Sequence, residues 1–229
     1  ELEKKKVGSP KERITAALIE AKSLPINELI QRTSLDEETI TEHLAAEEFV
    51  FYNGKEYSLQ WVINSIEEDI FDRLQDFHLA NSMKIGINKA MLLQSMQNRF
   101  SKALLDYVVE NGISNQIFKR KEQFVSLAEF IPHVPKSWAK RTENMLLELK
   151  KDGLTVRYLK DYFSTAGIPD NIEADLTHFL DDQELIVQLD EQFAYDGEVF
   201  KGAVDKLRSQ TGSEFEVGAA KDVLGLSRK

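Results

Sequence analysis

The sequence contains no cysteine, which excludes disulfide bonds, thiolate zinc sites and cysteine nucleophiles together. No apolar run approaches the roughly 18 residues that would indicate a membrane-spanning helix. The first ten residues are mostly charged and lack the apolar stretch of a secretory signal. These absences predict a cytoplasmic protein that does not have a membrane as a partner.

Motifs that carry chemistry are equally scarce. The four histidines, His43, His78, His133 and His178, lie far apart and show no metal-ligand spacing. The carboxylates form no recognisable acid/base pair, and no phosphate-binding G-x-x-x-x-G-K-[ST] sequence occurs. The sequence therefore predicts no catalytic residues, no metal, no cofactor and no enzymatic activity. His78 is interpreted as a turn or packing residue.

Charge is unevenly distributed along the chain. The net charge is −10, but residues 199–229 carry six basic and four acidic side chains. Residues 135–198 carry seven basic and fourteen acidic ones, so they would repel a polyanion. Any contact with nucleic acid is accordingly expected in the C-terminal segment.

Hydrophobic periodicity indicates helices that alternate with short β-hairpins. Helices are predicted over Pro10–Ala21, with Ile14, Leu18 and Ile19 facing inward, over Ile26–Thr33 and over Asp36–Leu44. Asn53-Gly54 then separates two β-prone runs, which is a strong hairpin signal. Three helices followed by a hairpin is the layout of a winged helix.

The same layout recurs in the next segment of the chain. Ile66–Phe77 and Met91–Met96 each show helical periodicity, and a third helix is expected to end at Asn111-Gly112. The wing is predicted as strands Ile113–Phe118 and Phe124–Leu127 around the basic turn Lys119–Glu122. Trp61 is interpreted as a packing residue at a helix start.

A third repeat and the beginning of a fourth follow. The third comprises helices over 135–151, 156–166 and 172–180 and a hairpin over 185–195. The fourth comprises helices over Val199–Ser209 and Val217–Leu224, with Leu226–Lys229 opening a further helix. The predicted fold is mainly α with small β-hairpins (α+β), a tandem array of winged-helix domains. Its domains are 1–60, 61–134, 135–198 and an incomplete fourth, 199–229.

Three local sequences resemble the C-terminal winged-helix region of bacterial selenocysteine-specific elongation factors. They are Phe77–Gly86, Phe124–Leu127 with Pro132-His133, and Phe215–Lys229. The last is similar to the family's closing motif, in which a leucine-glycine step and Ser-Arg-Lys introduce the recognition helix of the fourth domain. The resemblance implies a protein that binds the messenger RNA hairpin that recodes UGA, with domains one to three as a spacer.

The resemblance also implies partners and site residues. The complete factor carries selenocysteinyl-tRNA to the ribosome with GTP, and these two ligands belong to an N-terminal half that this sequence does not contain. The fragment is expected to be a monomer that contacts the mRNA hairpin and the ribosome. The expected RNA-binding residues are Ser227, Arg228 and Lys229, with Lys206 and Arg208 as further backbone contacts.

Each of these side chains suits a role at RNA. Ser227 can cap a helix whose N-terminus attracts phosphate. Arg228 can bind phosphate bidentately or stack on an unpaired base, and Lys229 adds a mobile point charge.

Two other functions stay open from the residues alone. A DNA-binding regulator would need basic recognition helices, yet the third helices of the three complete repeats, Asp36–Leu44, Ser101–Glu110 and Ile172–Leu180, carry few or no basic residues. A protein-interaction scaffold of winged helices would suit the overall acidity.

Overall fold

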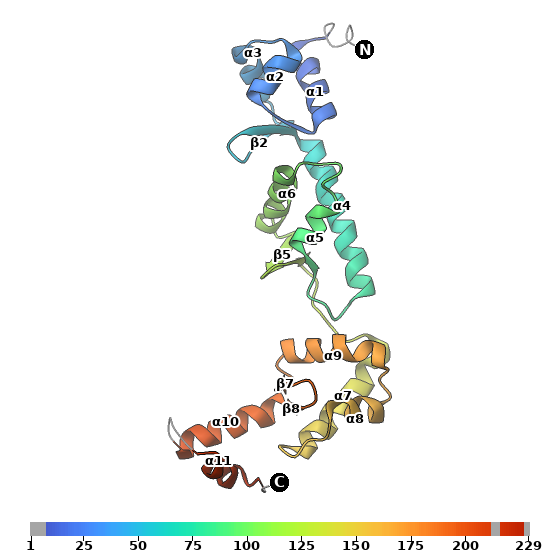
Figure 1. Ribbon diagram of the computed structural model, residues 1–229. Coiled ribbons are helices and arrows are strands. Elements are labelled where there is room, and N and C mark those ends of the chain that lie inside the picture. The colour runs from blue at the N-terminus through green and yellow to red at the C-terminus, as the bar shows by residue number, and fades with distance from the viewer. Residues whose placement is uncertain (1–7, 212–215, 227–229) are drawn as a thin grey trace. The chain divides into compact units, whose positions relative to one another are not determined.

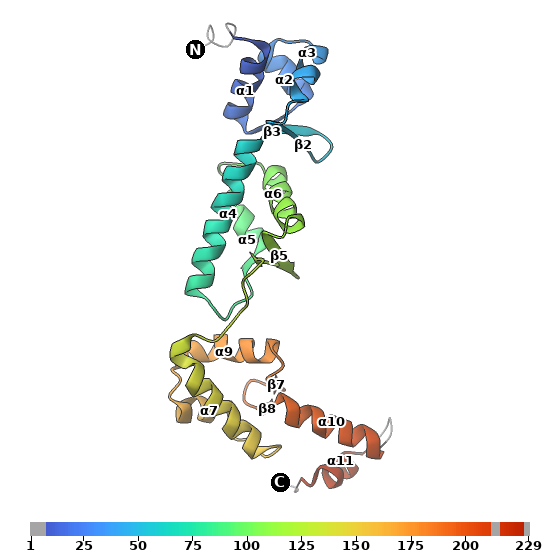
Figure 2. The same ribbon diagram turned by 180° about the vertical axis from the view of Figure 1, so that it is seen from behind.

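A computed structural model describes residues 8–211 and 216–226 (Figures 1 and 2). The chain forms two compact units, one of Glu1–Asn81 with Ile85–Ile131 and one of Ser82–Lys84 with Pro132–Lys229. Helices predominate and the strands form small antiparallel sheets, so the predicted fold class is confirmed. The division into four domains at residues 60, 134 and 198 stays a prediction.

The first repeat of unit 1 follows the sequence pattern closely. Its elements are α1 (Pro10–Ala21), α2 (Ile26–Thr33), α3 (Glu37–Leu44), β2 (Phe49–Tyr52) and β3 (Glu56–Leu59). Ser9 and Glu12 form a reciprocal capping box at the start of α1, which satisfies backbone N–H groups that a helix start leaves unpaired. Ile19, predicted to face inward, is exposed; it lies one residue beyond buried Leu18 and therefore points away from the core.

A third strand, β1 (Ser23–Pro25), completes the first sheet. It pairs antiparallel with β3, giving the order β1-β3-β2. The Ser58 hydroxyl donates to the Lys22 carbonyl at 2.6 Å and strengthens this pairing. The sheet thereby connects the end of α1 to the wing.

The second repeat of unit 1 has a long first helix and a second three-stranded sheet. Its elements are α4 (Gln60–Ala80), β4 (Ile87–Asn88), α5 (Lys89–Gln94), α6 (Lys102–Ser114), β5 (Phe118–Lys121) and β6 (Phe124–Leu127). The two views agree that α4 runs alongside α5 and α6 (Figures 1 and 2). Its buried stripe of Ile66, Ile70 and Leu74 belongs to the same hydrophobic core as Leu104 and Val108 of α6.

Two predictions for this wing are wrong. Gly112 does not end the third helix but is buried within α6. The ring of Phe118 packs so closely against it that a Cβ added at this position would lie 2.4 Å from Phe118 Cδ2. The left-handed turn after the helix falls on Gln116 instead, with φ of 59°. The strand consequently starts at Phe118, so Lys119–Lys121 form part of β5 and not a turn.

The two repeats of unit 1 are joined without a linker. β3 ends at Leu59 and α4 begins at Gln60, whose N–H donates to the Glu48 carbonyl at 2.8 Å. Tyr52 of β2 is buried, and its ring lies 5.1 Å from that of Tyr107 in α6. One continuous hydrophobic core includes both repeats, so they form one packed body.

Unit 2 has its own core, formed by residues such as Leu149, Phe163 and Leu180. Its elements are α7 (Lys136–Asp152), α8 (Leu159–Ala166), α9 (Asp170–Asp182), β7 (Ile186–Gln188), β8 (Ala194–Asp196), α10 (Gly197–Thr211) and α11 (Val217–Leu224). β7 and β8 form a two-stranded antiparallel hairpin. The helix predicted over 156–166 begins only at Leu159.

The second direct junction lies between β8 and α10. The N–H of Gly197 donates to the Leu185 carbonyl at 3.0 Å, and the Asp196 carboxylate accepts the N–H of Val199 at 3.0 Å. Lys150 of α7 forms an ion pair with Glu198. These bonds anchor the start of α10 to the hairpin and to α7.

In the described part of the chain, no helix is long and apolar enough to cross a membrane.

Candidate nucleic-acid interface

Helices α10 and α11 carry the described part of the predicted RNA-binding site. Lys206 and Arg208 are exposed on α10, and their role as RNA contacts stays a prediction. After α11, Gly225 adopts a left-handed conformation with φ of 69°, and the N–H of Leu226 donates to the Lys221 carbonyl at 2.9 Å. This turn ends the helix just before Ser227. Ser227, Arg228 and Lys229 lie outside the described residues and stay predictions.

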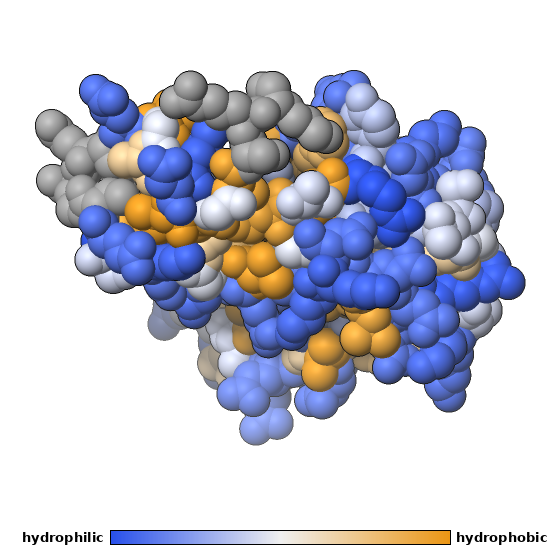
Figure 3. Space-filling model, turned by 90° about the horizontal axis from the view of Figure 1, so that it is seen from below, coloured by the Kyte–Doolittle hydropathy of each residue, from blue (hydrophilic) through white to orange (hydrophobic). Residues whose placement is uncertain are grey.

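The apolar side chains of these two helices are incompletely covered. Ala203, Val204, Val223 and Leu224 are half-buried, and 73% of Val217 is exposed. Figure 3 views the end of the molecule that carries α10 and α11 and shows hydrophobic surface gathered there. The described residues of the fourth repeat thus bury much less apolar surface than the earlier repeats do.

The third helices of the other repeats present acidic surfaces. Helix α9 begins with Asp170 and ends at Asp182, and α3 carries two glutamates in its first turn. On α6, Asp106 pairs with Lys89 at 2.8 Å. Helices of this charge repel phosphate, so they are poorly suited to contact a nucleic-acid backbone.

The first two basic side chains of strand β5 bind other residues of the same protein. Lys119 donates to the carbonyls of Ala128 and Phe130. Arg120 forms an ion pair with Glu110 of α6 at 2.8 Å. These contacts support the interpretation of the basic wing as a charged hairpin with a structural role.

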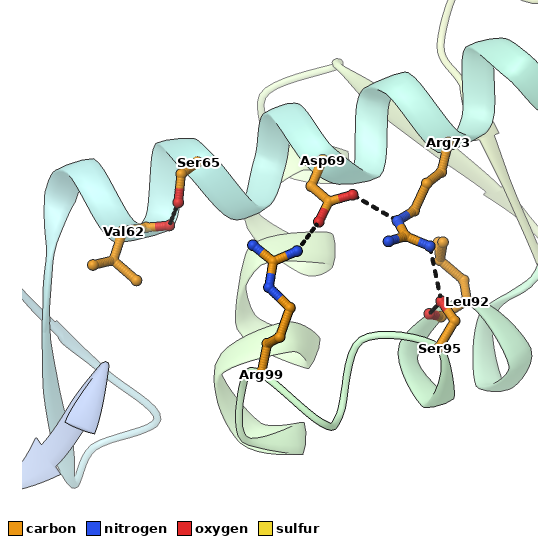
Figure 4. Close-up of polar contacts among 7 residues, drawn as sticks. All are labelled: Val62, Ser65, Asp69, Arg73, Leu92, Ser95 and Arg99. Atoms are coloured by element: carbon orange, nitrogen blue, oxygen red, sulfur yellow. Dashed lines mark hydrogen bonds and ion pairs between the residues drawn. The ribbon is translucent and has the colours of Figure 1, made fainter. Parts of the chain in front are cut away.

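A polar network holds α5 and the following turn against α4 (Figure 4). Asp69 of α4 accepts from Arg73 Nε at 2.6 Å and from Arg99 at 2.9 Å. Arg73 reaches the Ser95 hydroxyl at 3.4 Å, and that hydroxyl donates to the Leu92 carbonyl at 2.7 Å. The Asp69 carboxylate therefore joins α4 directly to the turn that contains Arg99, and Arg73 extends the network to Ser95 at the end of α5.

Replacing Asp69 by asparagine is expected to destabilise unit 1 by about 1 kcal/mol, because two arginines lose a charged partner at a half-exposed site. Urea denaturation would measure the change. The matched control is Glu68→Gln, which removes the same charge from the exposed neighbouring position of α4 and is expected to have little effect. Equal losses in the two variants would contradict the role of the network.

His78 is a packing residue, as predicted. It is buried near the end of α4 and stacks on Phe130 with ring centroids 3.6 Å apart. Its Nε2 accepts the N–H of Leu127 at 3.3 Å, so the proton of the neutral ring lies on Nδ1, which has no hydrogen-bond partner among the residues described. Burial and the nearby Lys119 ammonium lower the pKa of His78 to about 4.

The prediction that Trp61 is a packing residue is wrong. Half of its surface is exposed, at 51%, and Lys22 Nζ lies 5.8 Å from its ring centroid. As the second residue of α4 it points away from the stripe that meets α6.

The described residues contain no group of three or more histidines and carboxylates that could hold a metal ion.

The comparisons with known proteins bear on the second repeat most directly. Residues 71–127, from the middle of α4 to the end of β6, match the winged-helix family described as "Elongation factor SelB, winged helix". The match assigns residues 71–127 to this SelB winged-helix family. The motifs Phe77–Gly86 and Phe124–Leu127 both lie within these residues, so the resemblance noted from the sequence is confirmed there.

Solved structures also resemble the chain. One is the crystal structure of a bacterial selenocysteine-specific elongation factor, EF-Sec, at 19% sequence identity and a TM-score of 0.45. The match covers 95% of this chain but only 34% of the other, so the chain spans about a third of that protein's length. No curated protein matches the chain.

Proposed function

We propose that the chain is the messenger-binding part of a selenocysteine-specific elongation factor. Its fourth winged helix binds the selenocysteine-insertion hairpin of the mRNA, and the first three repeats act as a spacer. Selenocysteinyl-tRNA and GTP are partners of the complete factor only. The observation that carries this proposal is the match of residues 71–127 to the SelB winged-helix family. In the same chain this segment is followed by three helices with a hairpin, α7 to β8, and then by two further helices, α10 and α11.

The charge distribution supports placing the RNA at the C-terminal end. The described third helices α3 and α9 are acidic, and on α6 Asp106 and Glu110 form ion pairs with Lys89 and Arg120. Residues 199–229 are the net-positive segment. A phosphate backbone is attracted by clustered lysine and arginine and repelled by carboxylates.

Binding over a range of salt concentrations tests the proposal. The protein used is the chain with any natural sequence that follows Lys229. Its affinity for a selenocysteine-insertion hairpin is compared with that for an unrelated hairpin and for duplex DNA of equal charge. Selective binding of the insertion hairpin is expected. Preference for the duplex would favour a DNA-binding regulator, and equally weak binding to all three would favour a protein-interaction scaffold.

Replacing Arg228 and Lys229 together by alanine is expected to weaken hairpin binding at least tenfold. It should also lower the slope of log affinity against log salt by roughly 0.7 to 0.9 for each lost phosphate contact. A matched control removes two exposed cations from α7, Lys136→Ala with Lys151→Ala, and should change both quantities little. The same affinity and slope in the two double variants would show that Arg228 and Lys229 do not form the site.

A further inference from the structure

An exposed apolar surface lies at the tip of the β7–β8 hairpin. It consists of Tyr158, Leu189 and Phe193, here called the wing tip. Tyr158 precedes α8, and its ring stacks on that of Phe193 with centroids 5.1 Å apart and planes inclined by 30°. Leu189 directly follows β7. Tyr158 is 54% exposed and Leu189 59% exposed, whereas Phe193 is half-buried.

The wing tip is held in one conformation by local hydrogen bonds. The Asp190 carboxylate accepts the N–H groups of Gln192 and Phe193, both at 2.8 Å. The N–H of Leu159 donates to the Gln192 carbonyl at 2.7 Å, so the start of α8 is fastened to the turn. A surface ordered in advance loses little conformational entropy when a partner binds.

Its chemistry is that of a protein-binding surface. Tyrosine is enriched among the residues that contribute most to protein–protein affinity, and Leu189 adds exposed apolar surface to the wing tip. An aromatic pair alone would also suit stacking on an unpaired base. The surrounding charge decides between these two kinds of partner.

Carboxylates surround the wing tip. Asp190 and Glu191 form its turn, and Asp181 accepts the N–H of Gln188 in β7 at 3.2 Å. Their field repels a phosphate backbone and attracts lysine and arginine side chains.

The cations close to the wing tip do not reverse this field. Arg157 precedes Tyr158 but is held by Glu148 at 2.9 Å and by Asp152 at 3.2 Å. Lys160, exposed in the first turn of α8, is a single charge against the three carboxylates Asp181, Asp190 and Glu191. The local electrostatics therefore favour a basic partner.

We propose that the wing tip docks onto a basic protein segment, one that presents an apolar anchor flanked by lysine or arginine. The choice of the ribosome as the source of that segment rests on the proposed function, since a messenger-binding elongation factor works on the ribosome. None of the three wing-tip residues is among the predicted RNA-binding residues.

Site-specific photocrosslinking tests the docking. Leu189 is replaced by p-benzoylphenylalanine in the whole chain, which is then irradiated with purified bacterial ribosomes at physiological salt. The expected product contains a basic ribosomal protein and is destroyed by protease but not by ribonuclease. The matched control carries the same group at Leu147 of α7, which is also 59% exposed, and should crosslink far less.

Substitutions provide the second readout. Leu189→Ser and Tyr158→Ser are each expected to weaken ribosome binding about tenfold, whereas Leu147→Ser should leave it unchanged. A crosslink to ribosomal RNA or to a second copy of the chain, equal crosslinking from the two positions, or no crosslink at all would overturn the docking proposal. Hairpin binding is measured on the same proteins, so failure of the messenger-binding function is recognised separately.

Discussion

Replacing Gly197 by alanine is expected to lower the free energy of unfolding of unit 2 by about 3 kcal/mol. A Cβ at this position would lie 2.1 Å from the carbonyl oxygen of Glu184, and that oxygen belongs to the backbone of the turn after α9. The turn cannot move away easily, because the N–H of Gly197 donates to Leu185 in the same segment. Either α10 shifts away from the hairpin or the contact remains strained.

The control for this prediction lies in the same helix. A Cβ added at Gly202 would have no atom within 4 Å, so Gly202→Ala should stabilise the unit by about 0.5 to 1 kcal/mol through helix propensity. Urea denaturation followed by Trp138 fluorescence, in a Trp61→Phe background, reports on unit 2 alone because the chain has two tryptophans. Similar effects from the two glycine substitutions would contradict the close contact at Gly197.

Unit 1 is expected to lose about 2 to 3 kcal/mol of stability between pH 6.5 and pH 4 through His78 alone. Its pKa in the folded state is about 4, lowered first by burial and then by Lys119, while in the unfolded chain it returns to about 6.5. Between these values the unfolded state binds more protons, so stability falls as the pH falls. Above about pH 7.5, one unit beyond the unfolded pKa, the histidine is neutral in both states and its contribution is constant.

Comparison with a variant isolates this contribution from carboxylates that titrate in the same range. His78→Gln removes the titration and retains an acceptor for the Leu127 N–H. The difference in unfolding free energy between the two proteins, followed by Trp61 fluorescence in a Trp138→Phe background, should change with pH between 4 and 6.5 and level off by about pH 7.5. A difference independent of pH would show that His78 is protonated as readily in the folded state as in the unfolded chain.

The elements that the sequence predicted best are those determined by local signals. Ser9-Pro10 sets the start of α1, and Asn53-Gly54 sets the turn between β2 and β3. The elements α1, α2, β6 and α11 have the predicted bounds. β1 was missed because it has only three residues, including Pro25, and is a strand only through its pairing with β3. Gly112 was misread because its role depends on Phe118, six residues further along the chain.

The residues of the candidate site also differ in how far local sequence signals could predict them. Lys206 and Arg208 could be placed on a helix from periodicity, and the end of α11 from Gly225. The wing tip gave no signal in the sequence, because Tyr158 and Phe193 are 35 positions apart and meet only through the fold. Ser227, Arg228 and Lys229 depend on the resemblance alone, since they lie beyond the described residues.

The junction between β3 and α4 limits how this part of the chain can change in length. Since Leu59 is followed at once by the first residue of α4, one inserted residue would rotate the helix by about 100° about its axis. Ile66, Ile70 and Leu74 would then leave the core that they share with α6. Residues can therefore be inserted in hairpin turns such as Asn53-Gly54 without displacing this core. At the joint between the two repeats, evolution can substitute residues but cannot add them.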